Sequence, residues 1–103
     1  MYKLCFYVPE SHLELVKEAL FDAGAGRYKD YDKCSWQILG DGQFRPLNDS
    51  SPFIGDKNKL KTISEFKVEM LVDSNKIENI IQILLEVHPY EQPAYEFWEV
   101  NSI

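Results

Sequence analysis

The chain has little of what would place it in several common functional classes. Only two of its 103 residues are cysteines, Cys5 and Cys34, too few for a disulfide framework. Positive charge is scarce: 17 acidic residues against 11 basic ones give a net charge of −6, which disfavours binding to nucleic acids and to anionic membranes. No apolar run approaches the length of a membrane span, and the N-terminus lacks the length and cleavage site of a signal peptide. We therefore expect a cytoplasmic protein with reduced, buried cysteines.

The length and composition predict one folded domain over residues 1–103. Hydrophobic residues make up 45% of the chain and aromatic residues 14%, which is enough for a packed core and argues against disorder. A core of this size is only modestly stable by itself, so the chain gains from oligomerisation.

Hydrophobic periodicity predicts four strands and two helices. Alternation of apolar and polar residues predicts strands at residues 2–8, 34–39, 60–72 and 95–100. An S-x-x-E capping box predicts that the first helix begins at Ser11, and Gly24 is a natural stop. Asp73 or Ser74 is expected to cap the second helix, which ends before Pro89. The order β-α-β-β-α-β predicts an α+β ferredoxin-like sandwich, an antiparallel sheet with both helices on one face.

Residues 40–61 form a long excursion rich in Gly, Pro, Asn, Asp and Ser. Such a length is unusual for a structureless loop, so we expect a small hairpin or a packed segment pinned by Phe44, Phe53 and Ile54. The run Gly40-Asp41-Gly42 does not match a phosphate-binding loop. It is expected to be a tight turn in which the glycines supply positive φ.

The sheet is expected to be apolar on its second face as well. The residues that fall outside the helix-facing set include Cys5, Tyr7, Leu39, Leu71, Trp98 and Val100. Such a face needs a cover, which is another copy of the chain, a partner, or the excursion folded back over it. The alternating charges of Glu65, Lys67 and Glu69 are read as a solvated strand face.

The segment that follows the second helix carries the densest group of polar and aromatic residues. His88, Tyr90 and Glu91 could form a polar cluster with Arg45 in a crevice. Alternatively, His88 only caps the carbonyls of a helix-ending turn. Arg45 either pairs with one of three carboxylates, Glu65, Glu69 or Glu91, or binds an anion.

A dedicated metal site is not expected within one chain. Pro89 breaks the helix between His88 and Glu91, the second imidazole, His12, lies in the other helix, and the cysteines lack C-x-x-C spacing. A site shared between subunits stays open. No nucleophile has an evident base, because Ser11 is expected to act as a cap.

Six ordered blocks carry a resemblance that runs essentially from end to end. They are Gly24-Ala25-Gly26-x-Tyr28, Cys34-Ser35-Trp36, Gly40-x-Gly42-x-Phe44-Arg45-Pro46, Pro52-Phe53-Ile54-Gly55, Glu65-x-Lys67-x-Glu69 and His88-Pro89-Tyr90-Glu91-x-Pro93-Ala94-Tyr95. With them the chain resembles the YqfO-like module of the NGG-interacting-factor-like family. Lys67 is a departure, since family members usually have arginine there, which weakens any expectation of a bidentate ion pair.

The resemblance implies a fold similar to the CutA and PII signalling proteins, which tend to form trimers through their sheets. In long family members the module is inserted in an α/β domain that holds a two-metal site. The His-rich motifs of that domain are absent here, so the chain looks like a standalone form of the module. The hydrolase or cyclohydrolase labels of the long members are therefore not carried over.

These observations predict a non-catalytic, oligomeric accessory or regulatory module without a cofactor. It would bind a small ligand or a protein partner at clefts between subunits. The expected ligand-binding residues are Arg45, His88, Tyr90 and Glu91, and Phe44 and Trp98 are expected to pack or form interfaces. One alternative is a metal-binding protein with an inter-subunit site around His88 and Glu91. Another is a small enzyme acting on an anionic metabolite, with His88 as acid or base.

Overall fold

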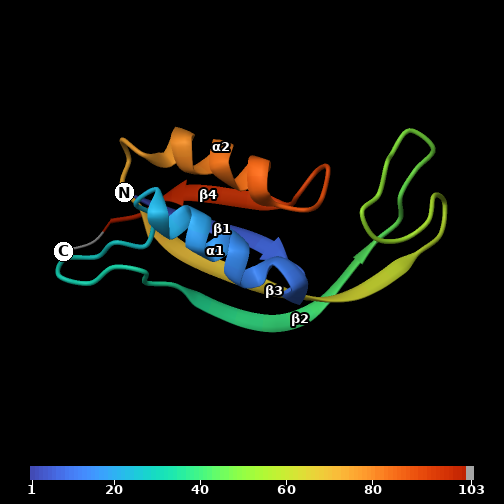
Figure 1. Ribbon diagram of the computed structural model, residues 1–103, viewed down its shortest axis with the longest axis horizontal. Coiled ribbons are helices and arrows are strands. Elements are labelled where there is room, and N and C mark those ends of the chain that lie inside the picture. Colours follow the sequence, from blue (N-terminus) through green and yellow to red (C-terminus); the bar gives the residue numbers. More distant parts are fainter. Residues whose placement is uncertain (102–103) are drawn as a thin grey trace.

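The computed structural model describes residues 1–101 and contains the predicted order of strands and helices (Figure 1). Four strands, two α-helices and one short 3-10 helix follow one another along the chain. They are β1 (Tyr2–Val8), η1 (Glu10–His12), α1 (Leu13–Asp22), β2 (Trp36–Phe44), β3 (Lys61–Val72), α2 (Ile77–Val87) and β4 (Tyr95–Glu99).

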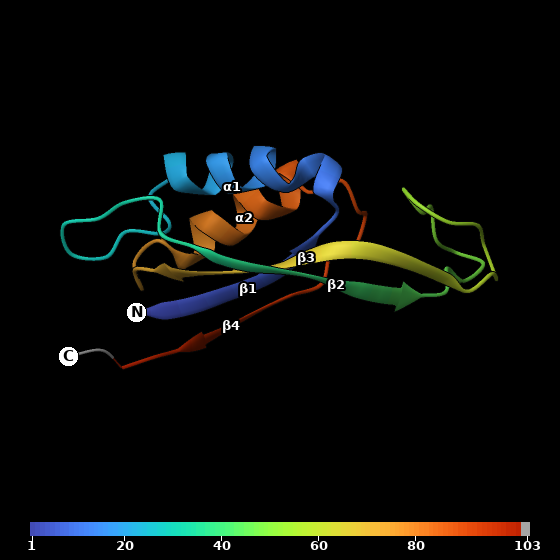
Figure 2. The same ribbon diagram turned by 90° about the horizontal axis from the view of Figure 1, so that it is seen from below.

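The four strands form one antiparallel sheet in the order β2-β3-β1-β4. Both helices lie on the same face of this sheet, and within residues 1–101 no helix or strand lies over the opposite face (Figure 2). This arrangement confirms the ferredoxin-like α+β fold that the alternation of strand and helix patterns predicted.

The core lies between the helices and the sheet. In β1 every second side chain points toward the helices, and Leu4, Phe6 and Val8 are fully buried there. The other elements contribute at the predicted spacing: Val68, Met70 and Val72 from β3, Leu13, Val16 and Leu20 from α1, and Ile77, Ile80 and Leu84 from α2. Burying each of these large side chains contributes about 1.5–3 kcal/mol, so this layer dominates the stability of the domain.

The start of the first helix differs from the prediction. Ser11 is not an N-cap, because Pro9 is followed by a 3-10 turn in which the His12 N–H donates to the Pro9 carbonyl at 3.0 Å. Ser11 lies inside that turn, and its Oγ is 2.8 Å from Nδ1 of His12. The α-helix therefore begins two residues later, at Leu13.

The second helix also begins without the expected side-chain cap. A turn closed by the Lys76 N–H on the Asp73 carbonyl leads into α2, and Lys76 holds the N-cap position. The Ser74 hydroxyl instead accepts a hydrogen bond from the amino group of Met1 at 2.8 Å. The predicted stop of the first helix is confirmed, since Gly24 follows α1 with a φ of 103°.

The second strand begins at Trp36, two residues later than predicted, and runs further, through Gly40-Asp41-Gly42 to Phe44. Gly40 pairs with Glu65 and Phe44 with Lys61, so this run is extended backbone and not the expected tight turn. Continuous pairing with β3 overrides the low strand propensity of glycine. Since β1 ends opposite Phe66, residues 40–44 and 61–65 continue beyond it as a two-stranded ribbon, here called the arm.

The excursion is consequently shorter than predicted and spans residues 45–60. It lies beyond the end of the arm on the side of the helices (Figure 2). It does not fold back over the helix-free face of the sheet, here called the open face. Of the three predicted covers for this face, the excursion is therefore not used.

The open face carries apolar side chains on every strand, beside the charged residues Lys3, Lys67, Glu69 and Glu96. Its apolar residues are Trp36 and Ile38 of β2, Cys5 and Tyr7 of β1, Leu71 of β3 and Trp98 of β4. Trp36, Ile38 and Trp98 are 56%, 52% and 44% exposed, which leaves large side chains without a cover. Leu39 was wrongly assigned to this face, because it pairs with Phe66, whose side chain packs against the core on the helix side.

Both cysteines are free, with Cys5 buried and Cys34 partly buried. Cys34 precedes β2 and does not belong to the strand. Of the helices in residues 1–101, none has both the length and the apolar character needed to cross a membrane.

Candidate functional site

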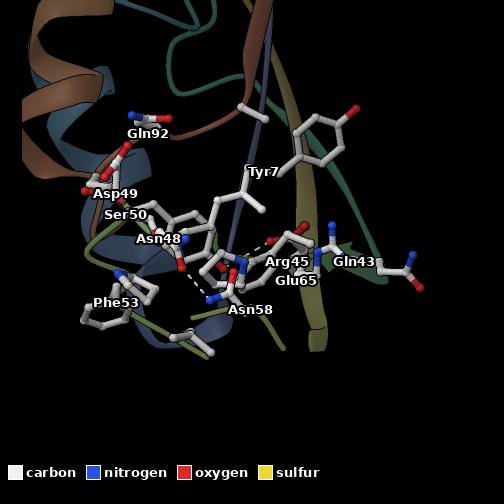
Figure 3. A pocket seen from close by; sticks show the side chains of 18 residues that line it. Tyr7, Gln43, Arg45, Asn48, Asp49, Ser50, Phe53, Asn58, Glu65 and Gln92 are labelled. Carbon is white, nitrogen blue, oxygen red and sulfur yellow. Dashed lines mark hydrogen bonds between the residues drawn. The ribbon is translucent and has the colours of Figure 1, made fainter. Parts of the chain in front are cut away.

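Three connections meet at the end of the sheet where β1 stops. They are the arm with the excursion, the start of the segment leading to α1, and the turn of residues 88–94 between α2 and β4. The arm, the excursion and the turn enclose a cavity of about 830 Å³ (Figure 3). Aromatic, amide and charged side chains from all three line it, so the site is built by segments far apart in sequence.

The structure brings three of the four predicted ligand-binding residues to this cavity. Arg45, Tyr90 and Glu91 line it together with Phe44, which was expected to pack or form an interface. His88 does not belong to the lining. Trp98 lies on the open face near the other end of the sheet, opposite Lys3.

Tyr90 and Glu65 form the central polar contact of the lining. The Tyr90 hydroxyl donates to Oε2 of Glu65 at 3.2 Å. Burial raises the pKa of Tyr90, and the neighbouring Glu65 carboxylate raises it further, so the hydroxyl stays protonated and remains a donor. Glu65 had been read from the sequence as part of a solvated strand face, and only the position of the turn reveals its role.

Glu91 ties the turn to the excursion. Its Oε1 accepts a hydrogen bond from the backbone N–H of Ser51 at 2.8 Å. Arg45 makes no ion pair within residues 1–101, so the expected pairing with Glu65, Glu69 or Glu91 is not present. Its guanidinium remains available to a bound group.

His88 lies behind the cavity wall and is only 6% exposed. Its Nδ1 accepts the backbone N–H of Tyr90 at 3.1 Å, so this nitrogen carries the lone pair. Its Nε2 therefore carries the proton and donates to the Tyr7 carbonyl at 2.6 Å. The ring fixes the turn that follows α2 against the end of β1; its donor goes to a carbonyl of β1 and not, as one predicted alternative had it, to the carbonyls of the helix-ending turn.

Four rings connect the two helices through the excursion. His12 meets Phe53 edge to face at a centroid distance of 5.6 Å, Phe53 meets Tyr90 at 6.3 Å, and Tyr90 meets His88 at 4.8 Å. Such aromatic pairs stabilise an arrangement beyond their burial alone. The chain of rings thus holds the excursion in place beside the turn.

The protonation of His88 makes stability depend on pH. Burial lowers the pKa of His88 below its ordinary value of 6.5; the Tyr7 carbonyl offsets part of this shift and the charge of His12 adds to it. Because the unfolded chain then takes up the proton first, the free energy of unfolding is highest above pH 6.5 and falls as the pH drops below it. Urea unfolding between pH 7.5 and 5.0 would show this loss in the wild type.

The matched comparison is His88→Gln with His12→Gln as control. Glutamine offers one donor and one acceptor but does not titrate, so His88→Gln should flatten the pH dependence, whereas His12→Gln should largely keep it. An unchanged pH dependence in His88→Gln would contradict the assignment.

Metal-binding side chains do not gather at this site. In the part of the chain that the structure describes, no three or more His, Cys, Asp or Glu residues come together in a way that could hold a metal ion. Both ring nitrogens of His88 are already engaged by backbone groups, and the Glu91 carboxylate holds Ser51.

Comparisons with known proteins agree with this fold. No family model matches the chain. Over 102 residues, 99% of its length, it is 37% identical to the Halalkalibacterium halodurans protein named GTP cyclohydrolase 1 type 2 homolog, of which it covers 27%. The chain thus spans about a quarter of the length of the curated relatives it matches.

Solved structures also match the chain along nearly its whole length. A Bacillus cereus protein related to NIF3 matches with a TM-score of 0.84 and 29% identity, over 98% of this chain and 26% of that one. The periplasmic divalent cation tolerance protein CutA from Archaeoglobus fulgidus matches with a TM-score of 0.71 over 99% and 86% of the two chains. At 14% identity this second match shows the fold alone. Along almost its whole length the chain is therefore similar to one segment of the GTP cyclohydrolase 1 type 2 homologs and of the NIF3-related protein, which agrees with the predicted resemblance to the YqfO-like module, and its fold is CutA-like.

Proposed function

We propose that the chain acts as a non-catalytic accessory or regulatory module. It assembles into a homo-oligomer and binds a small ligand or a protein partner at the cavity between the arm, the excursion and the turn. The observation that carries this proposal is the cavity of about 830 Å³, whose walls are fixed by specific contacts between distant segments. Binding sites commonly lie on connections that a rigid scaffold positions.

The open face supports the oligomer. Trp36, Ile38 and Trp98 expose large apolar surfaces on a sheet face that no segment of the described chain covers. Another copy of the chain would bury them. We propose a trimer, the assembly that the resemblance to the CutA and PII proteins implies, with the cavities near the subunit boundaries. Two free cysteines and an acidic surface suit a cytoplasmic protein.

We do not extend a hydrolytic activity to this chain. The relatives named GTP cyclohydrolase 1 type 2 homolog are about four times as long, and the shared part is the module alone. The one serine of the described cavity lining, Ser50, donates its hydroxyl to the Leu47 carbonyl, and neither histidine belongs to that lining.

Retention of ligands from a metabolite extract tests the cavity. The oligomer is incubated with the extract and washed, and the retained small molecules are identified by mass spectrometry. Phe53→Ala should abolish retention because Phe53 lines the cavity, whereas Leu60→Ala should not, since Leu60 is exposed in the same excursion but outside the lining. Equal retention by both variants would overturn the proposed site. If the wild type retains no small molecule, immobilised oligomers of the same two variants are compared for a bound protein.

We further propose that the module needs no metal. Dialysis against a chelator should shift the midpoint of thermal unfolding by less than about 2 °C, well below the roughly 4–8 °C that 1 kcal/mol produces in a domain of this size. Differential scanning calorimetry measures the midpoint, and elemental analysis measures the metal content. Stoichiometric metal together with a fall of several degrees would favour a site shared between subunits instead.

A further inference from the structure

We propose that the cavity binds an organic cation, an amine or a guanidine, on the carboxylate of Glu65. This inference rests on the proposed function of the cavity and names the chemical class of its ligand. Three features support it: the way Glu65 is positioned, the charge of the lining, and the aromatic rings that line the same cavity.

Two features position Glu65: the lack of a side chain at Gly42, which leaves room for the carboxylate, and a hydrogen bond from Tyr90. In the register of the sheet Glu65 faces Gly40, but its side chain leans diagonally over Gly42. A Cβ added at Gly42 would collide with the Glu65 carboxylate and lie 2.7 Å from its Cδ, whereas a Cβ at Gly40 would meet nothing within 4 Å. The Glu65 carboxylate can therefore lie over the backbone of Gly42 because glycine has no Cβ, and the hydrogen bond from the Tyr90 hydroxyl holds it there.

One oxygen of the Glu65 carboxylate is available to a ligand. Its Oε2 accepts from Tyr90, and Oε1 has no hydrogen-bond partner within residues 1–101. The Tyr90 hydroxyl donates to Glu65 and supplies no positive charge, so the negative charge is not neutralised. An N–H group that carries positive charge is the strongest partner for such an oxygen.

The lining as a whole is negative. The side chains of Asp49, Glu65 and Glu91 oppose a single cation, Arg45, in a chain of net charge −6. This balance repels polyphosphates and other polyanions and attracts cations. Arg45 can still hold a carboxylate on the same ligand, so a molecule with both a cationic nitrogen and one acid group also belongs to this class.

Aromatic rings complete the site. Phe44, Phe53, Tyr7 and Tyr90 line the cavity, and Phe53 and Tyr90 lie 6.3 Å apart (Figure 3). Ammonium and guanidinium groups are attracted to ring faces, and this attraction grows when the site excludes water. Carboxylate and rings together favour a cation over a neutral or anionic ligand.

Isothermal titration calorimetry of the intact oligomer with agmatine, a molecule with both an amine and a guanidine, tests the proposal. A short blocked peptide that contains one arginine is the second probe, and it distinguishes a free amine from a basic side chain of a protein. Glu65→Gln should weaken binding about 10- to 100-fold, the value of one charged hydrogen bond. Gly42→Ala should weaken it similarly by pushing Glu65 aside, and the fold should be retained because only the end of a flexible side chain must move.

Gly40→Ala is the matched control and should bind like the wild type. Binding of either probe that is lost in Glu65→Gln and Gly42→Ala but kept in Gly40→Ala supports the proposal. If inorganic phosphate or a nucleotide binds in an Arg45-dependent way and neither cation does, the ligand class is wrong while the cavity keeps its function. If the metabolite extract yields no ligand and no probe binds, the proposal falls together with small-ligand binding at the cavity.

Discussion

Replacing His88 by alanine is expected to lower the free energy of unfolding by about 2–4 kcal/mol, since it leaves two backbone groups unpaired and opens a cavity behind the turn. The Tyr7 carbonyl loses the donor at 2.6 Å, and the Tyr90 N–H loses its acceptor. The alanine cannot replace the edge-to-face contact of the imidazole with the Tyr90 ring. Loosening of the turn should then also reduce ligand binding, although His88 does not line the cavity.

Urea unfolding at pH 7.5 measures this loss, with His12→Ala as the control. The His12 ring packs against Phe53 near the surface, and its one hydrogen bond within residues 1–101 is to the neighbouring Ser11, so its removal should cost about 1 kcal/mol or less. Equal losses in the two variants, or a loss below 1 kcal/mol for His88→Ala, would show that His88 does not hold the turn. That result would return His88 to the group of candidate ligand contacts.

The second large effect is expected on the open face. Ile38→Glu should raise the dissociation constant of the oligomer by about 100-fold or more, because an unpaired carboxylate in an apolar interface costs several kcal/mol. Ile38 is 52% exposed in the isolated chain and lies in one row with Lys67 and Tyr7 on the open face.

Leu39→Glu is its matched control. Leu39 is the next residue of the same strand and is 57% exposed, but its side chain points to the helix side of the sheet. Sedimentation velocity over a range of protein concentrations measures assembly of the wild type and both variants. Dissociation by Leu39→Glu alone would assign the interface to the other side of β2, and retention of the oligomer in both would exclude β2 from it.

Much of the fold follows from local patterns in the sequence. The strand of residues 2–8 was predicted with its correct ends, since its strict alternation leaves one register that buries Leu4, Phe6 and Val8. The order of elements and the placement of both helices on one face follow in the same way. Gly24 ends α1 where expected, because its positive φ is a local property of the backbone.

Most of the incorrect predictions involve partners distant in the sequence. At Ser11 a local 3-10 turn forms in place of the predicted capping box. The hydroxyl of Ser74, expected to cap the second helix, instead accepts a hydrogen bond from the amino group of Met1, 73 residues away. The Gly40-Asp41-Gly42 run has the composition of a turn, yet pairing with β3 makes it a strand. At Ser74 and in the Gly40-Asp41-Gly42 run, a tertiary contact outweighed a local preference of about 1 kcal/mol.

The residues of the candidate site also fall into two groups, those that the sequence predicted and one that depends on distant contacts. The sequence singled out Arg45 beside the excursion and Tyr90 and Glu91 after the second helix, and the structure places all three around one cavity. Glu65 was not recognised, because its alternation with Lys67 and Glu69 looks like any solvated strand. Its role depends on the lack of a side chain at Gly42, which makes room for the carboxylate, and on the Tyr90 hydroxyl. Neither contact can be predicted without the register of the sheet.

Native mass spectrometry of the protein, purified without added metal or chelator, tests the central claim most directly. It reports the number of subunits and any retained small molecule in one spectrum. An oligomeric accessory module should appear as a trimer, three times 12.0 kDa, without a stoichiometric metal. A monomer at micromolar concentration would contradict the account, since the apolar open face would then have no second copy to cover it.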